Sequence, residues 1–169
     1  MSTPAPDVLS HPSVRRVAAA LAAHRVPGQV VVLDTSARTA RQAAASLGVQ
    51  VGQIANSLVF AARPRPLAPL EPLLVLASGA HRVDTAKVAD LMEVGEVTMA
   101  DPEFVRLRTG FAIGGVAPVG HLGRLRTAVD VSLARYDVVW AAAGHPHAVF
   151  KTSYPELLRI SGGHPVEVV

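Results

Sequence analysis

The segment TGFAIGGVAPVGHLGR, Thr109 to Arg124, places five glycines and one proline among apolar residues. Glycine inside a regular element costs about 0.5–1 kcal/mol relative to alanine, so its repeated use needs a reason. In an apolar stretch, that reason is a backbone that must approach another group closely. The residues alone leave two interpretations open. The segment is either a buried turn between two strands or a substrate loop whose N–H groups take part in chemistry.

Helices and strands are expected on both sides of this loop, and they follow one another in irregular order. The expected helices cover residues 12–26, 39–49, 84–92, 101–109 and 153–161, and the expected strands cover 29–34, 54–62, 73–78, 96–100, 125–133, 137–143, 147–152 and 164–169. Because strict alternation is missing, we expect an α+β (mixed α/β) fold with a curved, mixed and mostly antiparallel sheet flanked by helices. The proline-rich residues 63–72 should form an exposed connection between two strands. Residues 1–11 are expected to be a flexible tail and residues 12–169 one compact domain.

Composition limits the possible functions. The 169 residues are half hydrophobic and contain no cysteine, which excludes disulfides, thiolate zinc sites and a cysteine nucleophile. The first residues do not follow the pattern of a signal peptide, and no apolar run reaches the roughly 20 residues that span a membrane. We therefore expect a cytoplasmic protein without membrane contact, either a monomer or a weak homodimer. Fourteen arginines against two lysines reflect either a GC-rich genome or a surface that meets phosphates.

The histidines raise the question of a metal site. His145 and His147 are two residues apart, which places them on one face of a strand, and His121 could complete a three-histidine zinc site. No further ligand stands at helical spacing beside them, and Pro146 interrupts the segment. We favour capping and loop hydrogen bonds for these histidines and expect no metal.

Nucleophile and nucleotide motifs are also absent in their complete forms. Ser78, Gly79 and His81 in LASGAH lack the glycine on both sides of the serine that a nucleophile elbow has. The sequence GGVAPVG matches neither the phosphate-loop nor the dinucleotide fingerprint, so no cofactor is expected. What remains fits catalysis by positioning, in which backbone N–H groups hold a carbonyl oxygen while a water or a substrate hydroxyl attacks.

Several segments, taken together and in this order, resemble the YbaK/EbsC group of aminoacyl-tRNA deacylases. They are TARQAAASLGVQVGQIANSLVF, LLVLASGAHRVDTAKVADLM, ADPEFVRLRTGFAIGGVAPVGH, LRTAVD and WAAAGH, and the resemblance covers about residues 12–165. The group is related to the editing domain inserted in bacterial prolyl-tRNA synthetase. The resemblance implies a hydrolase that removes a wrong, small amino acid from tRNA, with tRNA(Pro) as the expected tRNA and prolyl-tRNA synthetase as a candidate partner.

The resemblance also implies roles for individual residues. The G-x-x-x-P signature of the family falls on Gly114 to Pro118, and in the family this loop lines the aminoacyl pocket. The residues expected to act in catalysis are Gly114, Gly115, Pro118 and Asp130. Those expected to contact the substrate are Asn56, Ser78, Gly79, Gly144 and His145.

Asn56 departs from the family pattern, because the cysteine-editing members carry a lysine there. Asparagine donates hydrogen bonds but brings no charge against phosphate. Either Asn56 orients a different substrate, or activity is weak, or Lys151 or an arginine supplies the charge; Asn56 could also merely cap its strand. This departure keeps a second hypothesis open, a non-catalytic protein of the same fold that binds tRNA 3′ ends or a small ligand.

Overall fold

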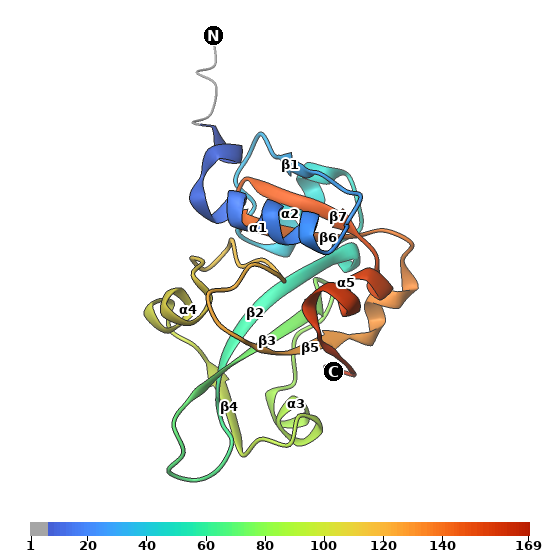
Figure 1. Cartoon of the computed structure of the whole chain (residues 1–169). Coiled ribbons are helices and arrows are strands. Elements are labelled where there is room, and N and C mark those ends of the chain that lie inside the picture. Colours follow the sequence, from blue (N-terminus) through green and yellow to red (C-terminus); the bar gives the residue numbers. More distant parts are fainter. Residues whose placement is uncertain (1–6) are drawn as a thin grey trace.

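The computed structural model describes residues 7–169 (Figure 1). The helices are α1 (Pro12–Ala23), α2 (Ala40–Leu47), α3 (Thr85–Leu91), α4 (Pro102–Thr109) and α5 (Tyr154–Ser161), with 3-10 helices η1 (Val8–Ser10), η2 (Val51–Gln53) and η3 (Val131–Arg135). The strands are β1 (Val30–Val32), β2 (Ile54–Arg63), β3 (Glu71–Ser78), β4 (Glu96–Met99), β5 (Arg126–Asp130), β6 (Val139–His145), β7 (Ala148–Thr152) and β8 (His164–Val166). No helix in this part of the chain is long and apolar enough to cross a membrane.

One eight-stranded mixed sheet organises the molecule. Its order is β1-β7-β6-β2-β3-β5-β8, and β4 adds to β2 beside this path. Strand β2 joins the two halves, because Ile54 and Ala55 pair with β6 while residues 60–63 pair with β4. Four of the strand pairings are antiparallel and three are parallel. The expected mixed α/β fold with a mixed sheet is confirmed.

Both faces of the central strands are covered, which explains why β3 reads as an unbroken apolar run. Leu74 and Leu76 face a core that includes α1, α5 and the glycine loop. Leu73 and Val75 face the opposite core, which includes α3. Successive side chains of a strand point to opposite faces, so a strand covered on both sides must be apolar throughout.

Local signals in the sequence place most helix ends correctly. Thr39 caps α2 in a reciprocal capping box with Gln42, and Gly48 closes that helix in the left-handed conformation. Asp84 caps α3, and Asp101 caps α4 ahead of Pro102. Each cap satisfies N–H or carbonyl groups that the helix end leaves unpaired.

Several elements differ in their bounds from expectation. Helix α1 ends at Ala23, β1 covers only Val30–Val32 and β8 ends at Val166, so each is shorter than expected.

Two further differences have a local cause. The strand expected over residues 125–133 stops at Asp130, whose Oδ1 accepts the Ser132 N–H at 2.9 Å and turns the chain into η3. Strand β3 begins at Glu71 and includes Pro72, two residues earlier than expected. Pairing with β5 starts at Leu73, so Pro72 lies where the strand has no neighbour on that side and its missing N–H is tolerated.

The start of the chain was expected to be a tail up to residue 11. Residues 1–6 lie outside the described part. Residues 7–11 form η1 and the N-cap of α1, and the Val8 side chain is buried in the core. These five residues therefore belong to the packed domain.

Candidate functional site

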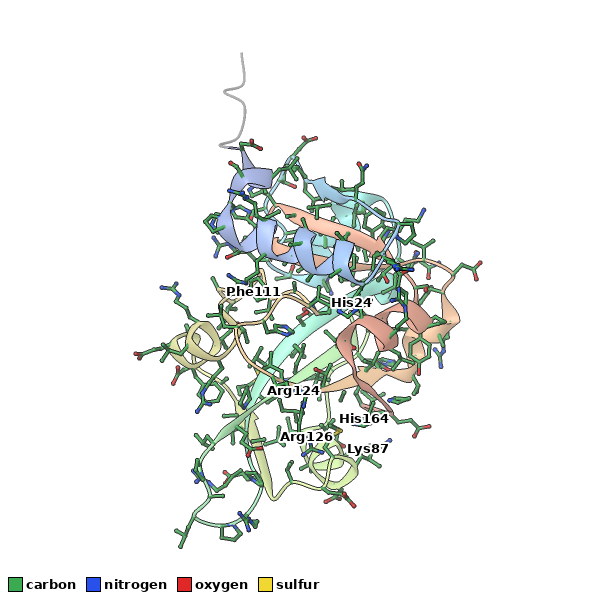
Figure 2. The ribbon with its side chains drawn as sticks, viewed as in Figure 1. His24, Lys87, Phe111, Arg124, Arg126 and His164 are labelled. Carbon is green, nitrogen blue, oxygen red and sulfur yellow. The ribbon has the colours of Figure 1, made fainter. Side chains whose placement is uncertain are left out.

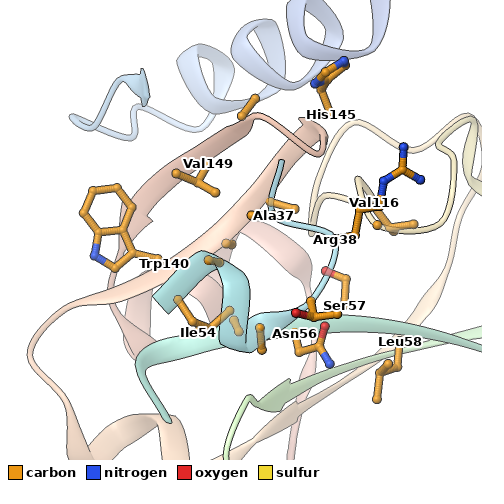
Figure 3. Close-up of a pocket in the computed structure, with 18 of the residues that line it drawn as sticks. Ala37, Arg38, Ile54, Asn56, Ser57, Leu58, Val116, Trp140, His145 and Val149 are labelled. Carbon is orange, nitrogen blue, oxygen red and sulfur yellow. The ribbon is translucent and has the colours of Figure 1, made fainter. Parts of the chain in front are cut away.

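A cavity of about 220 Å³ lies where β2 meets β6, beneath α2 and beside the glycine loop (Figure 3). It is lined by Ala37–Ala40, Ala43, Ile54–Leu58, Ile113, Gly114, Val116, Trp140–Ala142, His145, Ala148 and Val149. Most of these side chains are small and apolar. Larger hollows of about 520 and 500 Å³ lie elsewhere on the molecule, but neither includes the glycine loop.

The glycine loop reaches the cavity because one of its residues lacks a side chain. A Cβ on Gly115 would lie 3.0 Å from the backbone nitrogen of His145 and 3.1 Å from the His145 Cα. Glycine therefore lets the loop pack directly on the end of β6. Gly114 adopts φ +91°, a conformation that favours glycine. The geometry therefore shows the close backbone approach that the glycines predicted for this segment.

Helix α1 holds this loop in place. Arg16 donates from Nε to the Gly120 carbonyl at 2.7 Å and from Nη2 to the Gly110 carbonyl at 3.0 Å, and its guanidinium lies over the Phe111 ring. His121 Nε2 lies 2.6 Å from the Ala117 carbonyl oxygen. The loop is thus fixed at both ends and across its middle, as a preorganised site requires.

Few polar groups interrupt the apolar lining of the cavity, and some of them have no hydrogen-bond partner in the described part of the chain. Gly115 donates its N–H to Ala112, whereas the N–H groups of Gly114 and Val116 have no partner among the described residues. The Ser57 hydroxyl is buried and also lacks a partner there. The Asn56 side chain lies beside it on β2 (Figure 3). A buried polar group without a partner is costly, so the N–H groups of Gly114 and Val116 are candidate donors to a ligand or water. The Ser57 Oγ has almost no accessible surface and does not open onto the cavity.

His145 stands at the end of the cavity near α1. Its Nδ1 accepts the His147 N–H at 3.0 Å. Burial lowers the pKa of His145 below the usual 6.5, and the nearby charges of His11, His147 and Arg38 lower that pKa further. The neutral ring is therefore favoured, and with Nδ1 accepting, the proton sits on Nε2. His145 can thus act as a hydrogen-bond donor beside the cavity.

The model of the aminoacyl-tRNA editing domain matches residues 34–160, about three quarters of the chain. The chain belongs to this family. The Bacillus subtilis protein YwhH, which is uncharacterised, is 31% identical over 132 residues, covering 78% of this chain and 80% of YwhH. A proline–tRNA ligase of Nitratidesulfovibrio vulgaris is 31% identical over 127 residues, which are 75% of this chain and 20% of the ligase.

A solved structure described as a "putative trans-editing enzyme for prolyl tRNA synthetase" superposes on this chain with a TM-score of 0.84. The two are 42% identical, and the match covers 94% of this chain and 97% of the other. The resemblance found in the sequence is therefore confirmed. The family membership and the fold are shared with these proteins.

The editing domain brings some of the expected site residues together at the cavity. Asn56, Gly114 and His145 line it, and Gly115 packs against His145. Gly144 lies behind, at φ +96°, where a Cβ would be 2.8 Å from the Ser13 carbonyl oxygen of α1. Pro118 lies at the far end of the loop and lines a separate shallow hollow with His24 and Arg124.

Asp130, Ser78 and Gly79 form a group of their own behind the cavity wall. Asp130 is buried; its Oδ2 accepts the Ser78 N–H at 2.9 Å and lies 2.7 Å from His81 Nδ1. The Ser78 hydroxyl donates to the Gly52 carbonyl, so it is not poised as a nucleophile. A Cβ on Gly79 would lie 2.7 Å from the Ala40 Cβ, which belongs to the helix that walls the cavity. The group therefore supports the wall from behind.

The cations that were candidates to replace the family lysine lie at different places in the structure. Arg38 lines the cavity, whereas Lys151 faces a different hollow beside β1. Three residues that also line the cavity were not singled out from the sequence: Arg38, Ser57 and Trp140. Ser57 and Trp140 lie within segments that carry the family resemblance, whereas Arg38 lies just outside them. Across residues 7–169, no three histidine, aspartate or glutamate side chains are grouped so as to hold a metal ion.

Proposed function

We propose that this editing domain is a trans-editing hydrolase that removes a small amino acid from mischarged tRNA. One observation carries the proposal. The cavity is small and mostly apolar, and its lining includes Asn56, His145 and the loop residues Gly114 and Val116, whose N–H groups have no partner among residues 7–169. The ester of a small amino acid has a small side chain, which an apolar wall can hold, and a carbonyl oxygen, which a hydrogen-bond donor can hold. The cavity offers both. Because the relatives include proline–tRNA ligases, tRNA(Pro) is the first tRNA to test.

In the proposed reaction, a water oxygen attacks the ester carbonyl carbon and the bond to the ribose oxygen breaks. The ribose oxygen takes up the proton that the water loses, so the products are the free amino acid and tRNA with a free terminal hydroxyl. The carbonyl oxygen gains negative charge, which the loop N–H groups and the His145 Nε2–H can stabilise. Neutral His145 suits this role because its proton stays on the donor.

The cavity provides selection by exclusion. The aminoacylation site of a tRNA synthetase separates two amino acids that differ by one methylene by only about 1–3 kcal/mol of binding free energy. A second cavity walled by Ala37, Ala43 and Val149 admits a small side chain and excludes a larger one. Correctly charged tRNA would then escape hydrolysis because its amino acid does not fit.

The deciding experiment measures loss of the ester from Cys-, Ala-, Ser- and Thr-tRNA(Pro), with Pro-tRNA(Pro) as the control. We expect at least one of the mischarged tRNAs to be hydrolysed faster than the uncatalysed rate, while the control remains charged. If every ester survives at the background rate, this protein is not a deacylase for small amino acids on tRNA(Pro).

A second candidate function is a binding protein of the same fold without catalysis. Asn56 favours it, because the lysine of cysteine-editing relatives is missing from β2. The same samples distinguish the two candidates. Tight tRNA binding with no ester loss would favour the binding protein, whereas turnover with excess substrate requires the enzyme.

A further inference from the structure

Four basic side chains meet at the end of the cavity next to α1. The His145 ring lies 5.2 Å from the His11 ring and 5.6 Å from the His147 ring, measured between ring centroids. Arg38 lines the same cavity, and in Figure 3 its side chain lies near Val116, on the same side as His145. His11 caps α1, His147 lies in the turn between β6 and β7, and Arg38 precedes α2. Three separate elements thus bring positive or protonatable groups to one place, which we call the basic cluster (His11, Arg38, His145, His147).

Hydrogen bonds fix the two outer histidines, and their remaining ring nitrogens have no hydrogen-bond partner among residues 7–169. His11 Nδ1 accepts the Ser13 N–H at 3.2 Å, and His147 Nδ1 lies 2.9 Å from the Leu33 carbonyl oxygen. The glycine loop, which also packs on His145, contributes the Gly115 backbone and no charge at this contact. Asp34, next to Leu33, is exposed, and none of the ion pairs among residues 7–169 involves the basic cluster. A cluster of basic groups without a carboxylate is stabilised by an external anion.

We propose that the basic cluster binds the phosphodiester of the 3′-terminal nucleotide of tRNA; this rests on the proposed function. The aminoacyl ester sits on the ribose of that nucleotide, and its phosphate is attached to the same ribose. If the ester occupies the cavity, the phosphate must therefore lie just outside it. Asn56 carries no charge and Lys151 faces another hollow, so Arg38 with the histidines is the positive group at the correct place.

The proposal makes tRNA binding depend on pH. Burial, and then the charges of His11, His147 and Arg38, lower the pKa of His145, which stays neutral. A phosphodiester beside His11 and His147 favours the protonated form of these two rings, so binding takes up protons and tightens as the pH falls. Arg38 keeps its charge throughout and supplies the part of the affinity that does not depend on pH.

The test measures the dissociation constant of uncharged tRNA by fluorescence anisotropy at constant salt, between about pH 8 and about pH 6. We expect affinity about tenfold higher at the lower pH for each proton taken up. His147→Gln should abolish most of this increase, and His11→Asn should do the same, because asparagine preserves the helix cap but cannot titrate. Arg38→Gln should weaken binding at both pH values.

Matched controls come from a second basic surface. His164 lies with Lys87 and Arg126 beside a different hollow, which also contains Glu93 and Glu167 (Figure 2). His164→Gln should keep the full pH dependence, and Arg65→Ala, at the exposed β2–β3 connection, should keep the wild-type affinity. A tRNA lacking its terminal nucleotide should lose the pH dependence that complete tRNA shows.

Three results would overturn the proposal. They are equal pH dependence in His147→Gln and wild type, equal pH dependence with the shortened tRNA, and wild-type affinity of Arg38→Gln at both pH values. The assay uses uncharged tRNA, so its outcome is separate from ester hydrolysis. Hydrolysis without the pH effect would refute this inference alone, and the pH effect without hydrolysis would refute the deacylase alone.

Discussion

At the scale of single residues, Gly115 tests whether the loop position matters for hydrolysis. In Gly115→Ala the new methyl group would meet the backbone of His145, which cannot move aside like a flexible side chain. The loop donors should shift from the ester, and misplacement of about 1 Å can lower a rate about 100-fold. The measurement is the deacylation rate constant at saturating enzyme.

Gly123 in the same loop is the matched control, because a Cβ there would have no atom within 4 Å. Gly123→Ala should keep wild-type activity and thermal stability. Equal activity of both variants would show that the loop does not hold the ester.

Asn56 decides how much the missing lysine matters. If its side chain holds the substrate, Asn56→Ala should lower the hydrolysis rate at least tenfold, about 1.4 kcal/mol of transition-state binding. Asn56→Asp keeps the shape but removes the donor, so it should be as impaired as the alanine variant. Wild-type rates in both variants would leave Asn56 without a role in the reaction.

At the scale of secondary-structure elements, Asp130 joins β5, β3 and η3. Its carboxylate accepts N–H groups from Ser78 and Ser132, each at 2.9 Å. Asp130→Ala would leave both N–H groups without this acceptor, and each buried unsatisfied group costs about 1–3 kcal/mol. We therefore expect a loss of about 3 kcal/mol in the free energy of unfolding, or a melting temperature lower by about 6–12 °C.

Thermal unfolding followed by circular dichroism checks this prediction. Asp90→Ala, which removes an exposed carboxylate from α3, serves as the control and should change stability little. An unchanged melting temperature in Asp130→Ala would mean that Asp130 does not hold these elements together.

At the scale of the whole molecule, two histidines link stability to pH. Burial lowers the pKa of His121 below 6.5, against the opposing effect of its hydrogen bond to Ala117, and the charge of Arg16 lowers the pKa further. The pKa of His145 is lowered as well. The unfolded chain therefore binds protons more readily than the folded one, and stability falls as the pH decreases from about 6.5 toward the folded-state pKa.

His121→Gln should reduce this loss, because glutamine can still donate to the Ala117 carbonyl but does not titrate in this range. The urea midpoint, measured at several pH values between about 8 and 5, provides the comparison. If the urea midpoint of the variant falls with decreasing pH as much as that of the wild type, groups other than His121 cause the loss of stability in acid.

Much of the fold could be predicted because its signals are local. Thr39 with Gln42, Asp84, and Asp101 with Pro102 mark helix starts through contacts within one turn. The apolar run of β3 indicates burial without any knowledge of its neighbours. The end of β5 could not be predicted from alternation, because the Asp130 side chain turns the chain into η3 there. The caps and the strand runs depend on neighbours in sequence, whereas the site depends on neighbours in space.

By itself, the sequence determined the family and the mixed α/β class, and it predicted a substrate role for the loop from Gly110 to Gly123. Glycines at fixed spacing and capping residues are properties of the chain alone. The tertiary structure decided which residues share the cavity. It placed Arg38, Ser57 and His145 there, and it moved Asp130 behind the wall and Lys151 to another hollow. The physical reason is that β2 pairs in parallel with β6, more than 80 residues later in the chain. Contacts at such separation follow from strand pairing and packing, which no local pattern encodes.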